Sequence, residues 1–236
     1  MENEIHLFQT PVMDCAYLNN RLSCNHIVDP EYPLSPEKYD FLLGMGFRRS
    51  AGMIYRPACN NCDECKSSRV HVSAFKPNRS QRRAWKKTLG TLECLVKKAE
   101  FDPEHFQLYR QYTQARHLES DMKESSEEEY MGFLTSKWSQ TLFLELRNAG
   151  KLFAVAVTDR QPNSLSAVYT FFNPDFASLS PGVISILSQI EWAKKLGVDW
   201  LYLGYWIKDC QKMRYKTQYR PIQVFDDGHW KYMNAV

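Results

Sequence analysis

The chain has 236 residues, 44% hydrophobic and 24% charged, as expected of a globular protein with one large or two small domains. No apolar run approaches the roughly 20 residues that span a bilayer, and the acidic N-terminus lacks the basic and apolar regions of a signal peptide. We therefore expect a cytoplasmic protein without a membrane partner.

The positive charge is concentrated in one segment. Residues 66–98 contain ten Lys and Arg residues and one acid, whereas the rest of the chain contains 20 basic and 26 acidic residues. Such asymmetry, hidden behind a net charge of +3, indicates a polyanionic partner, and nucleic acid is the first candidate. An anionic membrane is the second candidate, but the segment lacks the long apolar face that membrane binding requires.

The first 98 residues predict short elements separated by turns. Several prolines make residues 1–35 loop-rich, and Ser35-Pro36 has the N-cap and first-turn pattern of a helix that Gly44 ends. The other elements expected here are a strand over 47–56, a strand over 69–75, a basic helix over 80–89 and a strand over 91–98.

The second half of the chain alternates helices and strands. We expect helices over 103–117, from Ser126 onward and over 181–195, a hairpin of strands over 141–147 and 152–158, and further strands over 165–172 and 200–206. A helix between the last two strands predicts a parallel pair with a right-handed crossover. This order matches an α/β (α+β) fold of the GNAT-like N-acyltransferase type in residues 81–236, preceded by an N-terminal Cys-containing subdomain in residues 1–80.

The phosphate-binding loop of acetyl-CoA enzymes has no good counterpart in the sequence. The nearest match is Arg147–Leu152, which ends in leucine and lies in the predicted hairpin turn instead of opening a helix. A CoA-dependent acetyltransferase is therefore a disfavoured alternative.

A run of three cysteines suggests a metal site. Cys59, Cys62 and Cys65 have the spacing at which thiolates converge on one soft metal, and Cys15 or Cys24 can supply a fourth ligand. We predict a structural Zn ion or Fe–S cluster at Cys15, Cys59, Cys62 and Cys65. Reduced thiols in a tight loop are the alternative.

Two basic stretches are candidates for binding anions. The segment 202–221 contains five aromatic residues and five cations against the single acid Asp209, a composition typical of surfaces that hold phosphates, carboxylates or stacked bases. The basic stretch 79–87, which overlaps the predicted helix over 80–89, has five cations without an acid and suits a phosphate backbone. In both cases a merely solvated face is the alternative.

These motifs resemble those of a known family. The run YLGYWIKDCQKMRYKTQYRP at 202–221 is similar to the C-terminal signature of arginyl-tRNA–protein transferases, and residues 55–70, with the three cysteines, resemble their N-terminal signature. Cys15-Ala-Tyr17-Leu18-x-x-Arg21, and Arg116-His117 with Met122, resemble the bacterial branch, the aspartate/glutamate leucyltransferases. The sequence departs from the family at CAYLNNR, where a proline and an acid are expected, and at Ser120, where glycine is usual.

The resemblance implies transfer of leucine from leucyl-tRNA to proteins with an N-terminal Asp or Glu, which marks them for degradation. The donor ester is already activated, so the chemistry requires no cofactor, and the acceptor amine has an ordinary pKa near 7.7–8.0. The nearest rival has the same fold and acceptor but an arginyl donor. A rival from another class is a non-catalytic, metal-stapled RNA-binding module.

Roles for individual residues follow as hypotheses. We expect Lys212 and Arg214, with Arg56 or Arg69 opposite, to bind the acceptor carboxylate. Lys216 and Arg220 are expected to hold the terminal adenosine of the tRNA and its phosphates. The pocket is expected to be lined by Tyr205, Tyr215 and Tyr219, with Tyr205 and Tyr215 contacting the reacting groups and Asp209 or Asp199 as a weak candidate base. The acceptor stem is expected to contact Arg79, Arg82, Arg83, Lys86 and Lys87.

Overall fold

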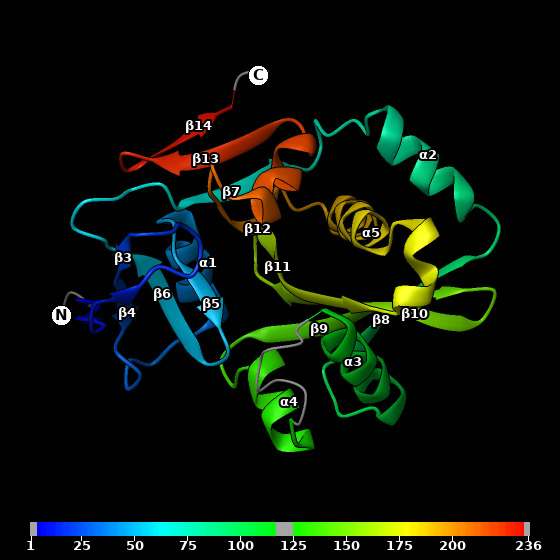
Figure 1. The fold of residues 1–236 in the computed structure, drawn as a ribbon, viewed down its shortest axis with the longest axis horizontal. Coiled ribbons are helices and arrows are strands. Elements are labelled where there is room, and N and C mark those ends of the chain that lie inside the picture. The colour runs from blue at the N-terminus through cyan, green and yellow to red at the C-terminus, as the bar shows by residue number, and fades with distance from the viewer. Residues whose placement is uncertain (1–3, 117–124, 234–236) are drawn as a thin grey trace.

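The computed structural model describes residues 4–116 and 125–233 (Figure 1). The motif positions His117, Ser120 and Met122 lie outside the described residues. The strands are β1 (Leu7–Gln9), β2 (Met13–Asp14), β3 (Leu22–Ser23), β4 (Asn25–Val28), β5 (Arg48–Ser50), β6 (Met53–Pro57), β7 (Lys66–His71), β8 (Leu92–Lys98), β9 (Gln140–Asn148), β10 (Lys151–Arg160), β11 (Ser164–Phe172), β12 (Trp200–Trp206), β13 (Ile222–Asp226) and β14 (His229–Tyr232). The helices are α1 (Pro36–Gly44), α2 (Arg79–Lys87), α3 (Pro103–Arg116), α4 (Glu127–Leu134), α5 (Pro181–Leu196) and the 3₁₀ segments η2 (Pro174–Leu179) and η3 (Gln211–Gln218).

The N-terminal region forms a small sheet in the order β1-β4-β6-β5, with α1 packed against it. Ser35 caps α1 by accepting a hydrogen bond from the Lys38 amide, as its sequence pattern predicts. The single strand expected over 47–56 is wrong: Ala51, at φ +49°, starts a tight turn that folds this stretch into the β5–β6 hairpin. We expected residues 1–35 to be mainly loop, but they hold four short strands. These strands form because their backbone groups pair with one another and with β6.

The large sheet has the strand order β14-β13-β7-β12-β11-β10-β9-β8. Most of its strands come from the second half of the chain, but β7 lies between β12 and β13 and is antiparallel to both. The N-terminal region therefore supplies one strand to the large sheet. The division of the chain near residue 80 stays a prediction.

The strands β11 and β12 form the parallel pair that was expected around the helix α5. Pro181 opens α5, and Gly197, at φ +68°, ends it in the left-handed conformation that glycine adopts readily. Only Ser164–Ser166 pair with Trp200–Tyr202, although both strands continue beyond this register. Beyond that point β11 stays with β10 and β12 stays with β7, so the sheet splits into two diverging halves with α5 between them (Figure 1). We call this divergence the splay.

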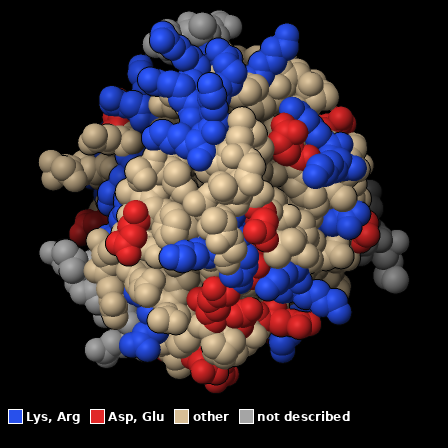
Figure 2. All heavy atoms as spheres, turned by 90° about the vertical axis from the view of Figure 1, so that its right-hand side faces the viewer, with Lys and Arg blue, Asp and Glu red and all other residues tan. Residues whose placement is uncertain are grey.

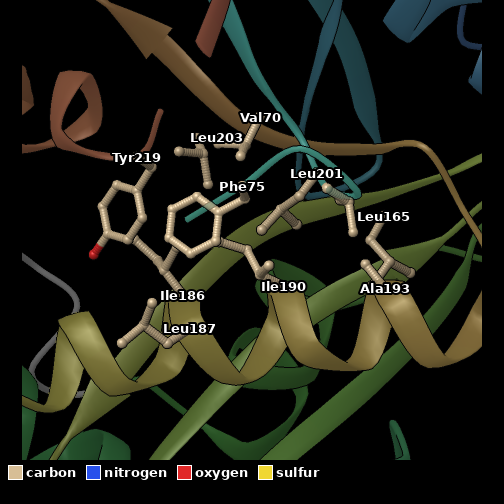
Figure 3. Packing of buried hydrophobic residues seen from close by; sticks show 11 residues of the cluster. Val70, Phe75, Leu165, Ile186, Leu187, Ile190, Ala193, Leu201, Leu203 and Tyr219 are labelled. Atoms are coloured by element: carbon tan, nitrogen blue, oxygen red, sulfur yellow. The ribbon is translucent and has the colours of Figure 1, made fainter. Parts of the chain in front are cut away.

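Helices cover both faces of the sheet near the splay. On one face, α5 contributes Ile186 and Ile190 to a cluster that includes Phe75, Leu201 and Tyr219 (Figure 3). On the other face, α3 and α4 pack on β10 and β11 through an aromatic-rich cluster. None of the helices in the described ranges has the length and apolarity to cross a membrane.

A buried ion pair fixes the N-terminal sheet to the large one. Arg49 of β5 donates to both carboxylate oxygens of Asp159 in β10, at 2.6 and 2.9 Å, and also to the carbonyl of Leu134. Both side chains are fully buried. The β5 strand is thereby held against the splay, and its other arginine, Arg48, enters the site described next.

Candidate functional site

The splay leaves backbone carbonyls without strand partners, and two basic side chains bond to them. Arg48 Nη2 donates to the Ala167 carbonyl of β11 at 3.0 Å, and Lys216 Nζ donates to the Tyr205 carbonyl of β12. Arg48 is 5% exposed and Lys216 is 6% exposed. The open edge of each diverging strand thus carries a buried cation.

The pKa of Lys216 is strongly perturbed by these surroundings. Burial, together with the positive charge of Arg48, lowers the pKa of Lys216 from 10.5 to about 7, while Cys210 acts in the opposite direction. Tyr215 lies beside it, with its ring centroid 5.9 Å from Lys216 Nζ. An amine that changes its charge near neutral pH at a gap in the sheet is typical of a functional site.

The remaining predicted residues of the segment 207–218 lie at the surface. Asp209 follows β12 in an exposed turn, and Lys212 and Arg214 are exposed on η3. Tyr215 is 44% exposed on the same segment. The structure therefore brings Tyr215 and Lys216 to the splay and leaves the other three side chains in solvent.

Two of the predicted tyrosines are held in the interior. The Tyr205 hydroxyl bonds to the carbonyls of Gly46 and Tyr55, at 3.1 and 3.0 Å, and ties β12 to the N-terminal region. Tyr219 stacks with Phe75 in the cluster packed against α5 (Figure 3), and burial raises its pKa. Tyr219 thus contributes to the core.

Arg56, Arg69 and Arg220, predicted to bind the acceptor or the terminal adenosine, each have a partner within the protein. Arg69 donates to Gln223 Oε1 at 2.9 Å and is sandwiched between the rings of Trp200 and Trp230, at 3.7 and 4.1 Å. Arg56 donates to the Met45 carbonyl, and Arg220 donates to the Met233 carbonyl. Asp199, the other candidate base, precedes β12, and its carbonyl accepts a hydrogen bond from the Val72 amide.

The predicted metal ligands surround one cavity of about 450 Å³. Its lining includes Cys15, Cys59, Cys62 and Cys65, and Arg21 donates to the Cys62 sulfur at 3.2 Å. All seven cysteines are free thiols. Cys24 instead bonds to the Ala58 carbonyl at 2.9 Å, so it is committed to the backbone.

These thiols do not fit a single zinc ion as they stand. Four thiolates about 2.3 Å from zinc would have sulfur atoms within about 4 Å of one another. Among the residues that the structure describes, the only three potential ligand atoms within 4.8 Å of one another belong to Asp102, His105 and Glu145. The cysteines are therefore spread around a wider space, which suits a group larger than one ion.

The acids of the Asp102, His105 and Glu145 set are already bonded to donors of the protein. Glu145 accepts hydrogen bonds from Arg147, Lys97 and His105, and Asp102 accepts from the first backbone amides of α3. Burial alone would raise the pKa of Glu145, but its three hydrogen-bond donors lower it to about 2. This arrangement is an internal ion network, and a cation would have to displace it.

The five predicted tRNA-binding cations are all exposed on α2. Figure 2 shows basic side chains gathered over α2 at the top of one face, with acidic side chains gathered lower on that face. Arg82 and Lys87 bond to nearby carbonyls, whereas Arg79, Arg83 and Lys86 have no partner among the described residues. Gln81 donates to the Gln218 carbonyl, which joins α2 to the end of η3. The basic helix and the segment at the splay thus adjoin.

Arg48 is the residue of this site that sequence reasoning missed. It stands in the doublet Arg48-Arg49 of a short strand, where both side chains had the pattern of ordinary surface cations. Its partner at Ala167 is 119 residues away in the chain. No local signal distinguishes it, because its burial depends on how the two sheets pack.

Comparisons with known proteins agree over almost the whole chain. Residues 13–83 match the sequence model described as "Arginine-tRNA-protein transferase, N terminus", and residues 104–226 match the one for the C terminus. The aspartate/glutamate leucyltransferase of Saccharophagus degradans is 44% identical, covering 97% of this chain and 97% of its own length. That of Alcanivorax borkumensis is 45% identical, covering 96% and 93%.

A solved structure supports the fold. A C-terminal DUF2156 domain from Agrobacterium fabrum has a TM-score of 0.52 at 13% identity, covering 94% of this chain and 81% of that one. With the large mixed sheet, this likeness confirms the expected mixed α/β fold of the GNAT-like type.

Proposed function

Since the chain belongs to the arginine-tRNA-protein transferase family, we propose that it transfers leucine from leucyl-tRNA to proteins whose N-terminal residue is Asp or Glu. The family resemblance predicted from the two end motifs is confirmed. The observation that carries the proposal is the near full-length identity to relatives named aspartate/glutamate leucyltransferase. The reaction would mark its protein substrates for degradation, and we place it in the cytoplasm, where aminoacylated tRNA is available.

The chemistry is an aminolysis of an ester. The free α-amine of the acceptor attacks the leucyl carbonyl, a C–N bond forms, and the ester C–O bond to the terminal ribose breaks. The amine loses a proton and the departing ribose hydroxyl gains one, so neither ATP nor CoA takes part. Placing amine and ester together supplies much of the rate, because a bimolecular step becomes effectively unimolecular.

We propose that this reaction occurs at the splay. Tyr215 is the predicted catalytic residue that lies beside Lys216 there, and we assign it the hydrogen bond to the reacting ester. The proposed role of Tyr205 is to position β12, since its hydroxyl is committed to two carbonyls. Asp209 remains the proposed base, acting through solvent because it is exposed.

The balance of buried charges favours leucine over arginine as the donor. An arginyl side chain needs an unpaired acid in its pocket, since a buried guanidinium requires a counter-charge. The two buried acids among the described residues, Glu145 and Asp159, are both paired with basic side chains of the protein. An apolar leucyl side chain makes no such demand.

For the tRNA, we propose that α2 contacts the phosphates of the acceptor stem. Its five exposed cations have no acid among them, and neutralised phosphates release counterions, which makes binding dependent on salt. The contact between α2 and η3 would then lead the acceptor end toward the splay.

We also propose a structural metal group at Cys15, Cys59, Cys62 and Cys65. No three of these thiols lie within 4.8 Å of one another, which favours an Fe–S cluster over a single zinc ion, and no step of the transfer passes through it. Analysis of iron, sulfide and zinc in protein purified without oxygen tests this: Cys62→Ser should lose the metal and Cys94→Ser, at an exposed thiol of β8, should keep it. Metal-free, folded wild-type protein would contradict the proposal.

Transfer itself is tested with leucyl-tRNA or arginyl-tRNA labelled on the amino acid and peptides that begin with Asp, Glu or Ala. We expect leucine on the Asp and Glu peptides only. Arginine on the same peptides would keep the reaction and change the donor. No transfer from either tRNA by folded protein would leave a non-catalytic RNA-binding module as the better account.

A further inference from the structure

Two buried cations meet at the splay without an acidic partner. Lys216 Nζ and Arg48 Nη2 both approach Gly204: a methyl group on its Cα would lie 3.5 Å from the first and 3.7 Å from the second. Gly204 has φ +84°, a conformation that favours glycine. Among the described residues, no acidic side chain forms an ion pair with either cation, although the buried Arg49 nearby is fully paired. Burying like charges together is unfavourable unless an anion joins them.

The guanidinium of Arg48 has hydrogen-bonding capacity to spare. Its Nη2 bonds to the Ala167 carbonyl, but its Nη1 is buried and has no partner among the described residues. Buried donors in native proteins are almost always bonded, so one left unpaired indicates a missing acceptor. Lys216 likewise uses one of its three donors for the Tyr205 carbonyl.

A single carboxylate fits this arrangement. Arginine matches the planar carboxylate with a pair of parallel donors, and a neighbouring ammonium adds a charge-assisted bond. One carboxylate placed beside the two cations supplies the negative charge that neither receives from an ion pair with the described residues. The phosphates of a nucleic acid backbone are better served by the exposed cations of α2.

We propose that Arg48 and Lys216 bind the side-chain carboxylate of the acceptor's N-terminal Asp or Glu, and so set the specificity of the enzyme for acidic N-termini. This inference rests on the proposed function for the identity of the ligand. It replaces the sequence-based assignment of this role to Lys212 and Arg214, which are exposed, with Arg56 or Arg69 opposite. It also moves Lys216 from the terminal adenosine to the acceptor. Exposed cations discriminate weakly because water and salt screen them, whereas a desolvated pair rejects an uncharged N-terminus strongly.

The test measures binding of fluorescent peptides that begin with Asp or Asn, in the absence of tRNA. Asn keeps the shape of Asp and removes the charge. We expect wild type to prefer the Asp peptide by at least about tenfold, the lower end for a charge-assisted hydrogen bond. Lys216→Met and Arg48→Gln should each weaken Asp binding by roughly 10- to 100-fold and leave Asn binding unchanged.

Matched controls separate this role from a general loss of structure or charge. Lys208→Met and Arg160→Gln remove exposed cations without an assigned role and should retain the preference for Asp. Arg48→Lys keeps the charge without the paired donors and should restore part of the preference. Thermal melting of each variant confirms folding, and Lys216→Met covers the case in which Arg48 variants do not fold.

The outcomes distinguish this inference from the function it rests on. Folded Lys216→Met and Arg48→Gln proteins that still prefer Asp would overturn the inference, even if wild type transfers leucine. Variants that lose binding of a CCA-ended RNA hairpin but keep peptide discrimination would overturn it in favour of a phosphate site. Wild type that binds Asp selectively through both cations yet transfers no leucine would support the carboxylate site and reject the proposed function.

Discussion

Replacing Lys216 with methionine should make the protein more stable at neutral pH, because the substitution removes a buried amine. Burial beside Arg48 lowers the pKa of Lys216 from 10.5 to about 7. The full difference corresponds to roughly 5 kcal/mol at 1.36 kcal/mol per pH unit, and because the folded amine is about half protonated at pH 7, about 4 kcal/mol of stability is lost there. Methionine also loses the bond to the Tyr205 carbonyl, worth about 1 kcal/mol. We expect a net gain of about 3 kcal/mol and a rise in Tm of roughly 6–12 °C.

The pH dependence of wild-type stability provides a second measurement of the same effect. Between pH 7 and pH 10.5 the unfolded chain holds a proton on Lys216 that the folded chain has released, so wild-type stability should rise with pH across this window. The groups that face this amine are Arg48 from β5, Cys210 before η3 and Tyr215 on η3. All three groups are present in both wild type and Lys216→Met, so the difference between the two proteins reports on Lys216.

Urea unfolding at pH 7 and pH 9 measures both effects. Lys216→Met should unfold at higher urea than wild type at pH 7, and the difference should shrink at pH 9. Lys208→Met, at an exposed position, should follow wild type at both pH values. Two results would contradict a stability cost of burying the Lys216 amine. One is a Lys216→Met protein no more stable than wild type at pH 7, and the other is a wild type whose stability does not rise with pH.

Three further predictions follow from other parts of the molecule. Asp159→Asn should lower the free energy of unfolding, measured in urea, by about 3–5 kcal/mol, because it leaves Arg49 buried without a counter-charge. Glu191→Gln, at a surface pair, should cost under about 1 kcal/mol, and equal effects of the two substitutions would contradict the burial argument. The lowered pKa of Glu145, about 2 against an ordinary 4.5, gives stability that is present above pH 4.5 and lost as the pH falls toward 2. In Glu145→Gln the free energy of unfolding should therefore fall less steeply than in wild type between pH 4.5 and pH 2, and an unchanged dependence on pH would count against this role. Arg83→Gln with Lys86→Gln should reduce the slope of log K for tRNA against log salt by roughly 2, measured by filter binding, and an unaltered slope would place the RNA elsewhere.

Local patterns were sufficient to predict most helices and the parallel pair. Ser35 and Ser126 cap α1 and α4 as expected, the latter in a full capping box with Glu129, because capping depends on residues three positions apart. The parallel pairing of β11 and β12 followed from the helix between them. The hairpin of β5 and β6 was missed, since Ala51-Gly52 is a weak turn signal and the surrounding residues suit a continuous strand.

The site was less predictable because its chemistry depends on contacts between distant segments. Tyr219 and Lys216 belong to one basic-aromatic run, yet Tyr219 packs against α5 while Lys216 reaches a strand carbonyl at the splay. Composition alone does not distinguish a residue of the core from a residue of the site. Arg48 belongs to the site only because β5 is held against the large sheet by the pair of Arg49 and Asp159.

One competition reaction tests the proposed transfer of leucine. The purified protein is given equal amounts of leucyl-tRNA and arginyl-tRNA together with a peptide that begins with Asp, and the product is identified by mass spectrometry. We expect the Asp peptide to gain leucine at its N-terminus and the matching Asn peptide to remain unmodified. Addition of arginine, or an unmodified Asp peptide with folded protein that binds tRNA, would contradict the proposed transfer.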